Sequence, residues 1–189
     1  MDKQFLRNEL RKKRALLSLE ERKAANQKIR ERFEKILQQK QFSKESVLYF
    51  YVSIHTEVDT RELLAYFLKE GYRIAVPKVT NQEAHEMKFY EIFHVSDLEK
   101  GFHGIYEPVS EGKKELTSNG IMIVPGLGFT KQKDRLGYGG GFYDSYFSRL
   151  NTDIFKVAFA YECQMVSELP IEETDHKIDM IITEETIYD

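Results

Sequence analysis

The spacing of apolar and polar residues predicts two helices at the start of the chain. Apolar residues between Phe5 and Leu17 form one stripe, which predicts an amphipathic helix over residues 2–17. The sequence Ser18-Leu19-Glu20-Glu21 has the pattern of a capping box. A second helix is therefore predicted to begin there and to end near Gln39.

After the second helix, short apolar runs alternate with polar segments. The runs predicted to be strands are residues 47–52, 73–76, 88–92, 121–124, 156–160 and 180–183. Asp59 or Thr60 is expected to cap a helix that ends before Gly71, and another helix is expected from about Gly141 to about Leu150.

Pro77 and the segment 93–120 interrupt the pattern of strands and helices. Pro77 is expected to close the strand over 73–76, and residues 93–120 are polar and interrupted by glycines, so their order is not predicted. The alternation of strands and helices predicts an α/β fold with a mainly parallel sheet and helices on both faces. In such sheets ligands bind at the carboxyl ends of the strands.

Length and composition narrow the class of protein. A chain of 189 residues, of which 31% are charged and 41% hydrophobic, predicts a single domain over residues 1–189. No apolar run approaches the ~20 residues that span a bilayer, and the first residues lack the apolar core of a signal peptide. The single cysteine, Cys163, excludes an internal disulfide. We expect a cytoplasmic protein.

The charge is distributed unevenly. Residues 1–40 hold 13 Lys/Arg and 6 Asp/Glu, whereas the remainder holds 15 and 25. A basic arm on an acidic body fits nucleic acid, a membrane surface or a phosphate-bearing small molecule. Lys3, Arg7 and Arg11 share one helix face and together can hold a polyphosphate. A solvated face is the alternative, and Lys12, Lys13 and Arg14 fit the solvated face better.

The segment RLGYGGGFYD, residues 135–144, is the strongest candidate for a binding site. Glycines allow the backbone to curl and to present several N–H groups to one oxyanion, and Arg135 adds a planar set of donors. The preceding strand and following helix match the usual order around a phosphate-binding loop. A glycine-rich surface turn is the alternative. The segment is not a Walker A motif, and Lys131 replaces the third glycine of a dinucleotide fingerprint.

Three carboxylates are further candidates. Glu57 follows the strand over 47–52, where it can accept hydrogen bonds from an amino-substituted heterocycle or be solvated beside a helix start. Asp144 follows the glycine loop and Asp179 precedes the last predicted strand, and such carboxylates suit magnesium shared with substrate phosphates. His55 is expected to be a surface loop residue.

With these segments in hand, the chain resembles the 5-formyltetrahydrofolate cyclo-ligases, also called methenyltetrahydrofolate synthetases. The motifs that carry the resemblance are VPGLGF at 124–129 with RLGYGGGFYD, supported by KQFLR at 3–7, YVSIHTEVDT at 51–60 and KIDMIIT at 177–183. The resemblance implies a Rossmann-like sheet. It also implies a reaction that uses ATP and Mg²⁺ to convert 5-formyltetrahydrofolate into 5,10-methenyltetrahydrofolate, through an N5-iminium phosphate, with release of ADP and phosphate.

The resemblance also implies roles for individual residues. Arg135 and Lys3 would be the catalytic cations, and Asp144 and Asp179 the magnesium positions. The residues that would bind ATP are Lys3, Gln4, Phe5, Leu6, Arg7, Arg135, Leu136, Gly137, Tyr138, Gly139, Gly140, Gly141, Phe142 and Tyr143. Those that would bind the folate are Val52, Glu57, Tyr138, Gly139, Gly140, Gly141 and Phe142.

The sequence departs from the family where an aspartate and a glycine often precede Arg135, since Thr130 and Lys133 stand there. We expect a monomer that acts on small molecules and binds neither nucleic acid nor membrane. A nucleic-acid-binding module led by the basic arm, and an ATP-using ligase or kinase with another acceptor, are the rival interpretations.

Overall fold

A computed structural model of the chain describes residues 2–101, 104–109 and 113–189. The helices are α1 (Lys3–Ala15), α2 (Leu19–Gln39), α3 (Thr60–Lys69) and α4 (Phe142–Ser148). The strands are β1 (Val47–Tyr49), β2 (Arg73–Asn81), β3 (Glu86–Ile92), β4 (Leu98–Lys100), β5 (Tyr106–Pro108), β6 (Gly120–Ile123), β7 (Gly128–Phe129), β8 (Arg135–Leu136), β9 (Ile154–Phe159), β10 (Met180–Ile182) and β11 (Ile187–Tyr188). Short 3-10 turns occupy Val95–Asp97 and Glu162–Gln164.

Seven strands form one sheet in the order β11-β10-β9-β6-β1-β2-β3. The pairs β10–β9, β9–β6, β6–β1 and β1–β2 are parallel, and the outer strands β3 and β11 are antiparallel to their neighbours. From β1 the chain moves outward to β2 and later returns to the other side of β1 as β6. The order therefore reverses between β1 and β6, which is where an open α/β sheet binds ligands.

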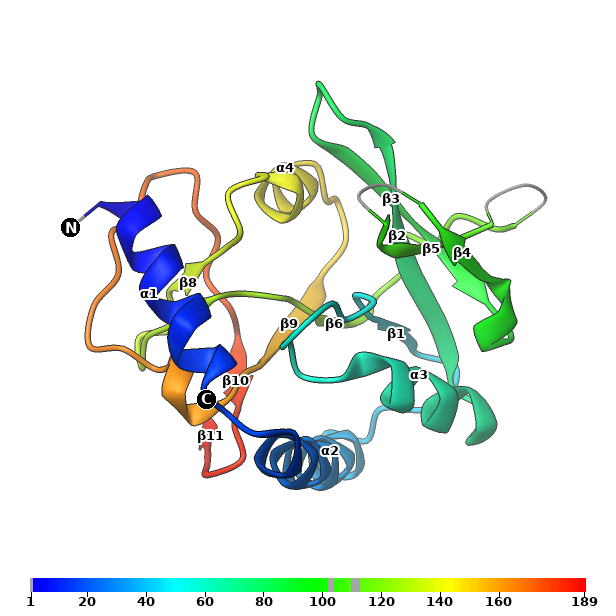
Figure 1. Cartoon of the computed structure of the whole chain (residues 1–189). Coiled ribbons are helices and arrows are strands. Elements are labelled where there is room, and N and C mark those ends of the chain that lie inside the picture. Colours follow the sequence, from blue (N-terminus) through cyan, green and yellow to red (C-terminus); the bar gives the residue numbers. More distant parts are fainter. Residues whose placement is uncertain (1, 102–103, 110–112) are drawn as a thin grey trace.

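Two apolar layers cover the sheet, one on each face (Figure 1). Leu48 and Ile121 point to the side of α2 and α3, where they pack with Phe33 and Phe67. The residues that alternate with them, such as Met122, point to the opposite side and pack in the cluster that contains α4. The predicted mainly parallel α/β sheet with helices on both faces is thus confirmed.

Local sequence explains where several helices begin. Ser18 and Glu21 form the predicted capping box, with Ser18 N donating to the Glu21 carboxylate at 2.7 Å. The side chain of Asp59 accepts from Arg61 N at 2.9 Å and caps α3. No helix among the described residues has the length and apolar character needed to cross a membrane.

The structure corrects the predicted ends of some strands. β1 stops at Tyr49 rather than at Val52, and β2 continues through Pro77 to Asn81 instead of ending before it. β1 pairs only with residues up to Ala75, so among the described residues no strand of the sheet pairs with β2 on that side beyond this point, and a residue without an N–H is tolerated there.

The segment 93–120, which had no predicted order, contains two short strands that pair with each other. β4 and β5 form an antiparallel ladder of their own, and residues 102–103 and 110–112 of this segment lie outside the described residues. β7 and β8 form a second small antiparallel pair that leads into the glycine loop.

Candidate functional site

A large cavity lies at the carboxyl ends of the central strands, where the strand order reverses. Its walls include Tyr51 to His55 and Glu57, which follow β1, and Pro125, which follows β6. Its volume of about 1320 Å³ exceeds the ~300–1000 Å³ that is common for a pocket that holds one drug-sized ligand. The cavity therefore has room for two ligands side by side.

The glycine loop and the basic helix α1 meet at one end of this cavity. Arg7 Nε donates to the carbonyl of Gly137 at 3.0 Å, so segments 130 positions apart in the sequence are in direct contact. Gly139 and Gly141 have φ values of +100° and +67°, which are strained for residues with a side chain. A Cβ at Gly139 would lie only 3.3 Å from the Arg7 guanidinium. Close packing against α1 thus adds to the requirement for glycine.

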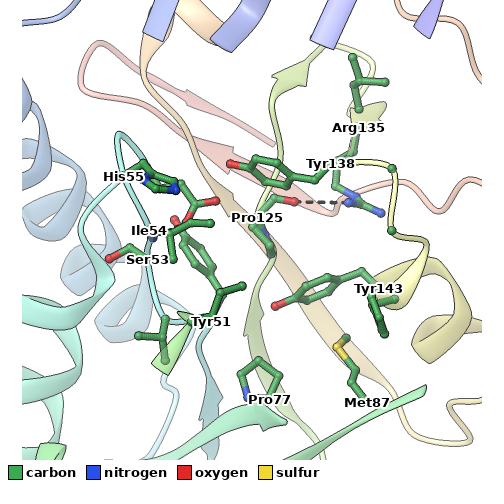
Figure 2. Close-up of a pocket in the computed structure, with 18 of the residues that line it drawn as sticks. Tyr51, Ser53, Ile54, His55, Pro77, Met87, Pro125, Arg135, Tyr138 and Tyr143 are labelled. Atoms are coloured by element: carbon green, nitrogen blue, oxygen red, sulfur yellow. Dashed lines mark hydrogen bonds between the residues drawn. The ribbon is translucent and has the colours of Figure 1, made fainter. Parts of the chain in front are cut away.

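Arg135 lies on β8 beneath this loop and is buried. Its Nη2 donates to both carboxylate oxygens of Asp144 at 2.7 Å, and its Nη1 donates to the carbonyl of Pro125 at 3.3 Å (Figure 2). The buried Nε makes no hydrogen bond within the described part of the chain. Arg135 therefore joins the segment that follows β6 to the first turn of α4, and it is one of the residues that line the cavity.

Lys3 also has carboxylate partners. Its Nζ lies 2.9 Å from Asp175 and 3.0 Å from Glu172, both in the loop that precedes β10. Burial lowers the pKa of Lys3, but the hydrogen bonds to Asp175 and Glu172 outweigh it and leave the pKa raised. The N–H of His176 donates to Asp144 at 3.2 Å, which brings the Asp175 segment beside Asp144.

Asp175 lines the cavity but was not among the aspartates selected from the sequence, which were Asp144 and Asp179. Asp144 and Asp175 both line the cavity, but among its described lining residues Asp179 is not found. The Asp179 carboxylate instead accepts from Lys156 N at 2.7 Å and lies 3.6 Å from Lys156 Nζ. Asp175 and Asp179 are only four positions apart, so the sequence gives no reason to prefer one of them as a cavity residue. The path of the loop before β10 determines that Asp175 lines the cavity.

Only some of the predicted ATP-binding residues in α1 line the cavity. Lys3 and Arg7 line the cavity, whereas Gln4, Phe5 and Leu6 are not among its described lining residues. Phe5 is 59% exposed and Leu6 packs in a small apolar cluster. One helix face cannot present consecutive residues to the same ligand, because each residue is rotated by about 100° from the last. The other predicted ATP and folate residues, from Val52 and Glu57 to Arg135–Tyr143, all line the cavity.

Glu57 marks the other end of the cavity. It is 9% exposed, and its carboxylate accepts from the backbone N–H of Ile54 at 2.8 Å. Burial raises the pKa of Glu57, while hydrogen bonds from Tyr138 and Ile54 act in the opposite direction. The alternative that Glu57 is solvated beside a helix start is therefore wrong.

Aromatic side chains surround this carboxylate. In Figure 2, Tyr51, Tyr138 and Tyr143 converge on the space beside Pro125, and Met87 lies below Tyr143. The Tyr143 hydroxyl is buried and makes no hydrogen bond within the described residues. This end of the cavity thus combines flat apolar surfaces with a few polar atoms, as suits a flat heterocycle.

Arg14 was predicted to be solvated, and the structure shows that prediction to be wrong. It is only 5% exposed, its Nε donates to Thr56 at 3.0 Å and its Nη1 donates to the Tyr138 hydroxyl at 2.8 Å. The sequence carried a signal, since Arg14 follows the buried residues Leu6 and Leu10 at the same four-residue spacing.

The departures from the family pattern before Arg135 leave the turn in place. Lys133 has φ +68°, the left-handed conformation that a glycine adopts most readily. Its N–H donates to the carbonyl of Thr130 at 2.9 Å, and the Thr130 hydroxyl donates to Asp134 at 2.9 Å. The turn is thus closed by Thr130 and Asp134 and accepts lysine at some conformational cost.

Comparison with known proteins agrees with this geometry. Residues 1–184 match the 5-formyltetrahydrofolate cyclo-ligase family. The chain is 28% identical to the 5-formyltetrahydrofolate cyclo-ligase of Mus musculus, with 97% of this chain and 94% of the relative covered. It is 30% identical to that of Haemophilus influenzae, with 92% of each covered. The structure of the Aquifex aeolicus 5,10-methenyltetrahydrofolate synthetase superimposes with a TM-score of 0.81 at 30% identity, covering 99% of this chain and 92% of the other.

Proposed function

Because this chain belongs to the 5-formyltetrahydrofolate cyclo-ligase family, we propose that it converts 5-formyltetrahydrofolate into 5,10-methenyltetrahydrofolate at the expense of ATP. The observation that carries the proposal is that basic residues of α1, the glycine loop and Glu57 line one and the same cavity. Its volume of about 1320 Å³ accommodates a nucleotide beside a folate.

The glycine-loop end supports binding of the ATP phosphates. Lys3, Arg7 and Arg135 supply cationic donors, and the turn between Gly139 and Gly141 supplies backbone N–H groups without a side chain in the way. Charge in phosphoryl transfer spreads over the transferring oxygens, so donors, cations and alignment are what the reaction requires. No protein nucleophile is needed.

The Glu57 end supports binding of the pterin. A buried carboxylate accepts hydrogen bonds from the amino group and ring N–H of a pterin, and the surrounding tyrosines offer flat faces for the ring. Val52 lies on the same wall of the cavity. The pterin at Glu57 and the phosphates at the glycine loop would then place the N5-formyl group between them.

The chemistry follows from that order. The formyl oxygen attacks the γ-phosphorus of ATP, the bond to ADP breaks, and an N5-iminium phosphate results. N10 then attacks the activated carbon and loses its proton, and phosphate leaves with the former formyl oxygen. The ring closes as the methenyl cation. Phosphorylation is required because the unmodified oxygen would have to leave as oxide or hydroxide.

Asp144 and Asp175 suit a magnesium ion that is shared with ATP. Magnesium is commonly held by one or two carboxylates together with substrate phosphates and water. No group of three or more His, Cys, Asp or Glu side chains that could hold a metal ion occurs among the described residues. When bound, the ion would neutralise negative charge on the transferring phosphoryl group. Asp179 is not part of this proposal.

The direct test is incubation of the purified protein with Mg-ATP and 5-formyltetrahydrofolate, followed by the near-ultraviolet absorbance of the methenyl product. We expect absorbance to rise with one ADP released per product. 5-Methyltetrahydrofolate is the matched control, because it lacks the oxygen that accepts the phosphoryl group. A folded protein that gives no product would reject the proposal, and ADP release with the control substrate would reject the proposed role of the formyl oxygen.

A further inference from the structure

Arg14 is a buried cation that does not itself reach the cavity. It lies near the end of α1, is 5% exposed, and is absent from the described cavity lining. Its guanidinium donates to polar side chains of two other segments, Thr56 and Tyr138. A guanidinium loses much hydration on burial and is retained only where its partners compensate.

The partners of Arg14 lead to the pterin end of the site. Tyr138, whose hydroxyl accepts from Arg14 at 2.8 Å, donates a hydrogen bond to Glu57. Thr56, the other partner, directly precedes Glu57 in the chain. In Figure 2 the Tyr138 hydroxyl points away from Arg135 and toward the segment that carries His55. Arg14 is therefore linked to Glu57 through the Tyr138 side chain and through the backbone of Thr56, and it is not among the described residues that line the cavity.

We propose that Arg14 is a positioning residue for the folate, because it holds the Tyr138 hydroxyl and the Thr56 side chain so that the Glu57 carboxylate faces the pterin. This inference rests on the proposed function for the identity of the ligand. It assigns helix α1 a second task beyond the phosphates: its first turns face the glycine loop, and its last turn orients the opposite end of the site.

Electrostatics favour the same assignment. The groups that bear on Glu57 are Arg14, Tyr138, Tyr51, Tyr143 and His55. The tyrosines are neutral at ordinary pH, since burial raises the pKa of each. His55 is exposed, so its charge is screened by water. Arg14 is thus the buried positive charge that favours the ionised form of Glu57, which is the form that accepts hydrogen bonds from a pterin.

The test compares binding of the two substrates in Arg14→Met and Arg14→Lys. We expect the Kd for 5-formyltetrahydrofolate to rise about tenfold in Arg14→Met, while the Kd for ATP changes less than about twofold. Arg14→Lys restores the charge but not the paired donors, so it should recover part of the loss. Lys13→Met removes the same charge from an exposed neighbouring position and is expected to leave both constants unchanged.

A double-mutant cycle tests whether Arg14 acts through Tyr138. In a Tyr138→Phe background, Arg14→Met should weaken folate binding by much less than in the wild type, because the shared hydroxyl is already gone. Equal losses in both backgrounds, equal losses for folate and ATP, or an unchanged folate Kd would overturn the inference. If Arg14→Met does not fold, Arg14→Lys and Tyr138→Phe carry the same comparison.

Wild-type turnover in the same preparations separates this inference from the proposed function. A wild type that makes no methenyl product rejects the proposed reaction. A wild type that does, together with Arg14 variants of unchanged folate affinity, rejects the role of Arg14 alone. As the pH is lowered, the folate-dependent rate of Arg14→Met should begin to fall at a higher pH than that of the wild type. The reason is that Glu57 would lose a positive charge that stabilises its ionised form.

Discussion

The two ends of the cavity hold their charged groups in different ways. At the glycine-loop end, Lys3 and Arg135 already lie within 3.0 Å of carboxylates. At the other end, Glu57 is buried among tyrosine hydroxyls and a backbone N–H, with Arg14 held behind Tyr138. The first arrangement must exchange partners when a polyanion arrives, whereas the second is organised before any ligand binds. Changes at the first end should therefore affect ATP use and turnover, and changes at the second should affect folate affinity.

Arg135→Ala is expected to have the largest effect. Loss of a preorganised donor at the transferring phosphoryl group should lower kcat by about 100-fold to 1000-fold. The variant also leaves Asp144 without its 2.7 Å partner. Turnover and thermal unfolding measured together would separate chemistry from folding, with Arg149→Ala, an exposed arginine of the same region, as control. Comparable kcat in both variants would refute the assigned role.

Glu57→Gln should lower kcat/KM for 5-formyltetrahydrofolate by about 10-fold to 100-fold, because hydrogen bonds to a charged acceptor contribute about 1.5–3 kcal/mol. The amide keeps the shape of the side chain but loses its charge and replaces an acceptor oxygen with a donor. KM for ATP is the internal reference and should remain nearly constant. If the KM values for 5-formyltetrahydrofolate and for ATP both rose in this variant, the proposed separation of folate and ATP binding between the two ends would be contradicted.

Asp175→Asn and Asp179→Asn sharpen the assignment of the metal position. We expect Asp175→Asn to raise the magnesium concentration needed for half-maximal rate by about tenfold, since one of two carboxylates is neutralised. Asp179→Asn should shift it by less than about twofold, because that side chain binds Lys156 away from the cavity. The opposite result would assign the magnesium position to Asp179 rather than to Asp175.

Lys3→Met should raise KM for ATP by about fivefold while changing stability little. The ion pairs of Lys3 involve a partly exposed group, with side-chain exposure of 20% for Lys3 and 66% for Glu172, and such pairs contribute at most about 1 kcal/mol to folding. Steady-state kinetics and a thermal melt would be compared with the wild type. A large fall in Tm without a change in KM would make Lys3 a structural residue.

The smallest expected effect is a shift in pH dependence. Burial raises the pKa of Glu57, so its carboxylate gains a proton at a higher pH than an ordinary glutamate does. As pH falls, kcat/KM for folate should therefore begin to decline above the usual glutamate range. Glu57→Gln should lack this part of the acid limb. An identical acid limb in the wild type and the variant would exclude Glu57 as its source.

Much of the fold could be predicted because its signals are local. Apolar runs marked the central strands, and the capping box at Ser18 and the cap at Asp59 lie where the residues required them. The short pair β7–β8 and the extension of β2 past Pro77 carry no comparable pattern, because they depend on neighbours in the sheet rather than on their own sequence.

The residues of the candidate site could likewise be predicted only where the signal is local. The glycine loop, Arg135 and Glu57 were identified from residue type and from their positions after strands, and all line one cavity. Arg14 was assigned to the solvent, which is wrong because it is buried, and Asp179 was assigned to the metal position but is not among the described residues that line the cavity. Sequence spacing shows which residues share an element, but it does not show which face of that element another segment will cover.

The sequence by itself determined the order of the helices and of the strands β1, β2, β3, β6, β9 and β10, the basic α1 and the glycines that permit left-handed turns, since each depends on a residue and its near neighbours. Only the tertiary structure decided that Arg7 meets Gly137, that Asp175 rather than Asp179 lines the cavity with Asp144, and that Arg14 binds Tyr138. Such contacts join residues up to 172 positions apart, as between Lys3 and Asp175. They form because burial of the whole apolar sheet brings those segments together, and no local pattern encodes that outcome.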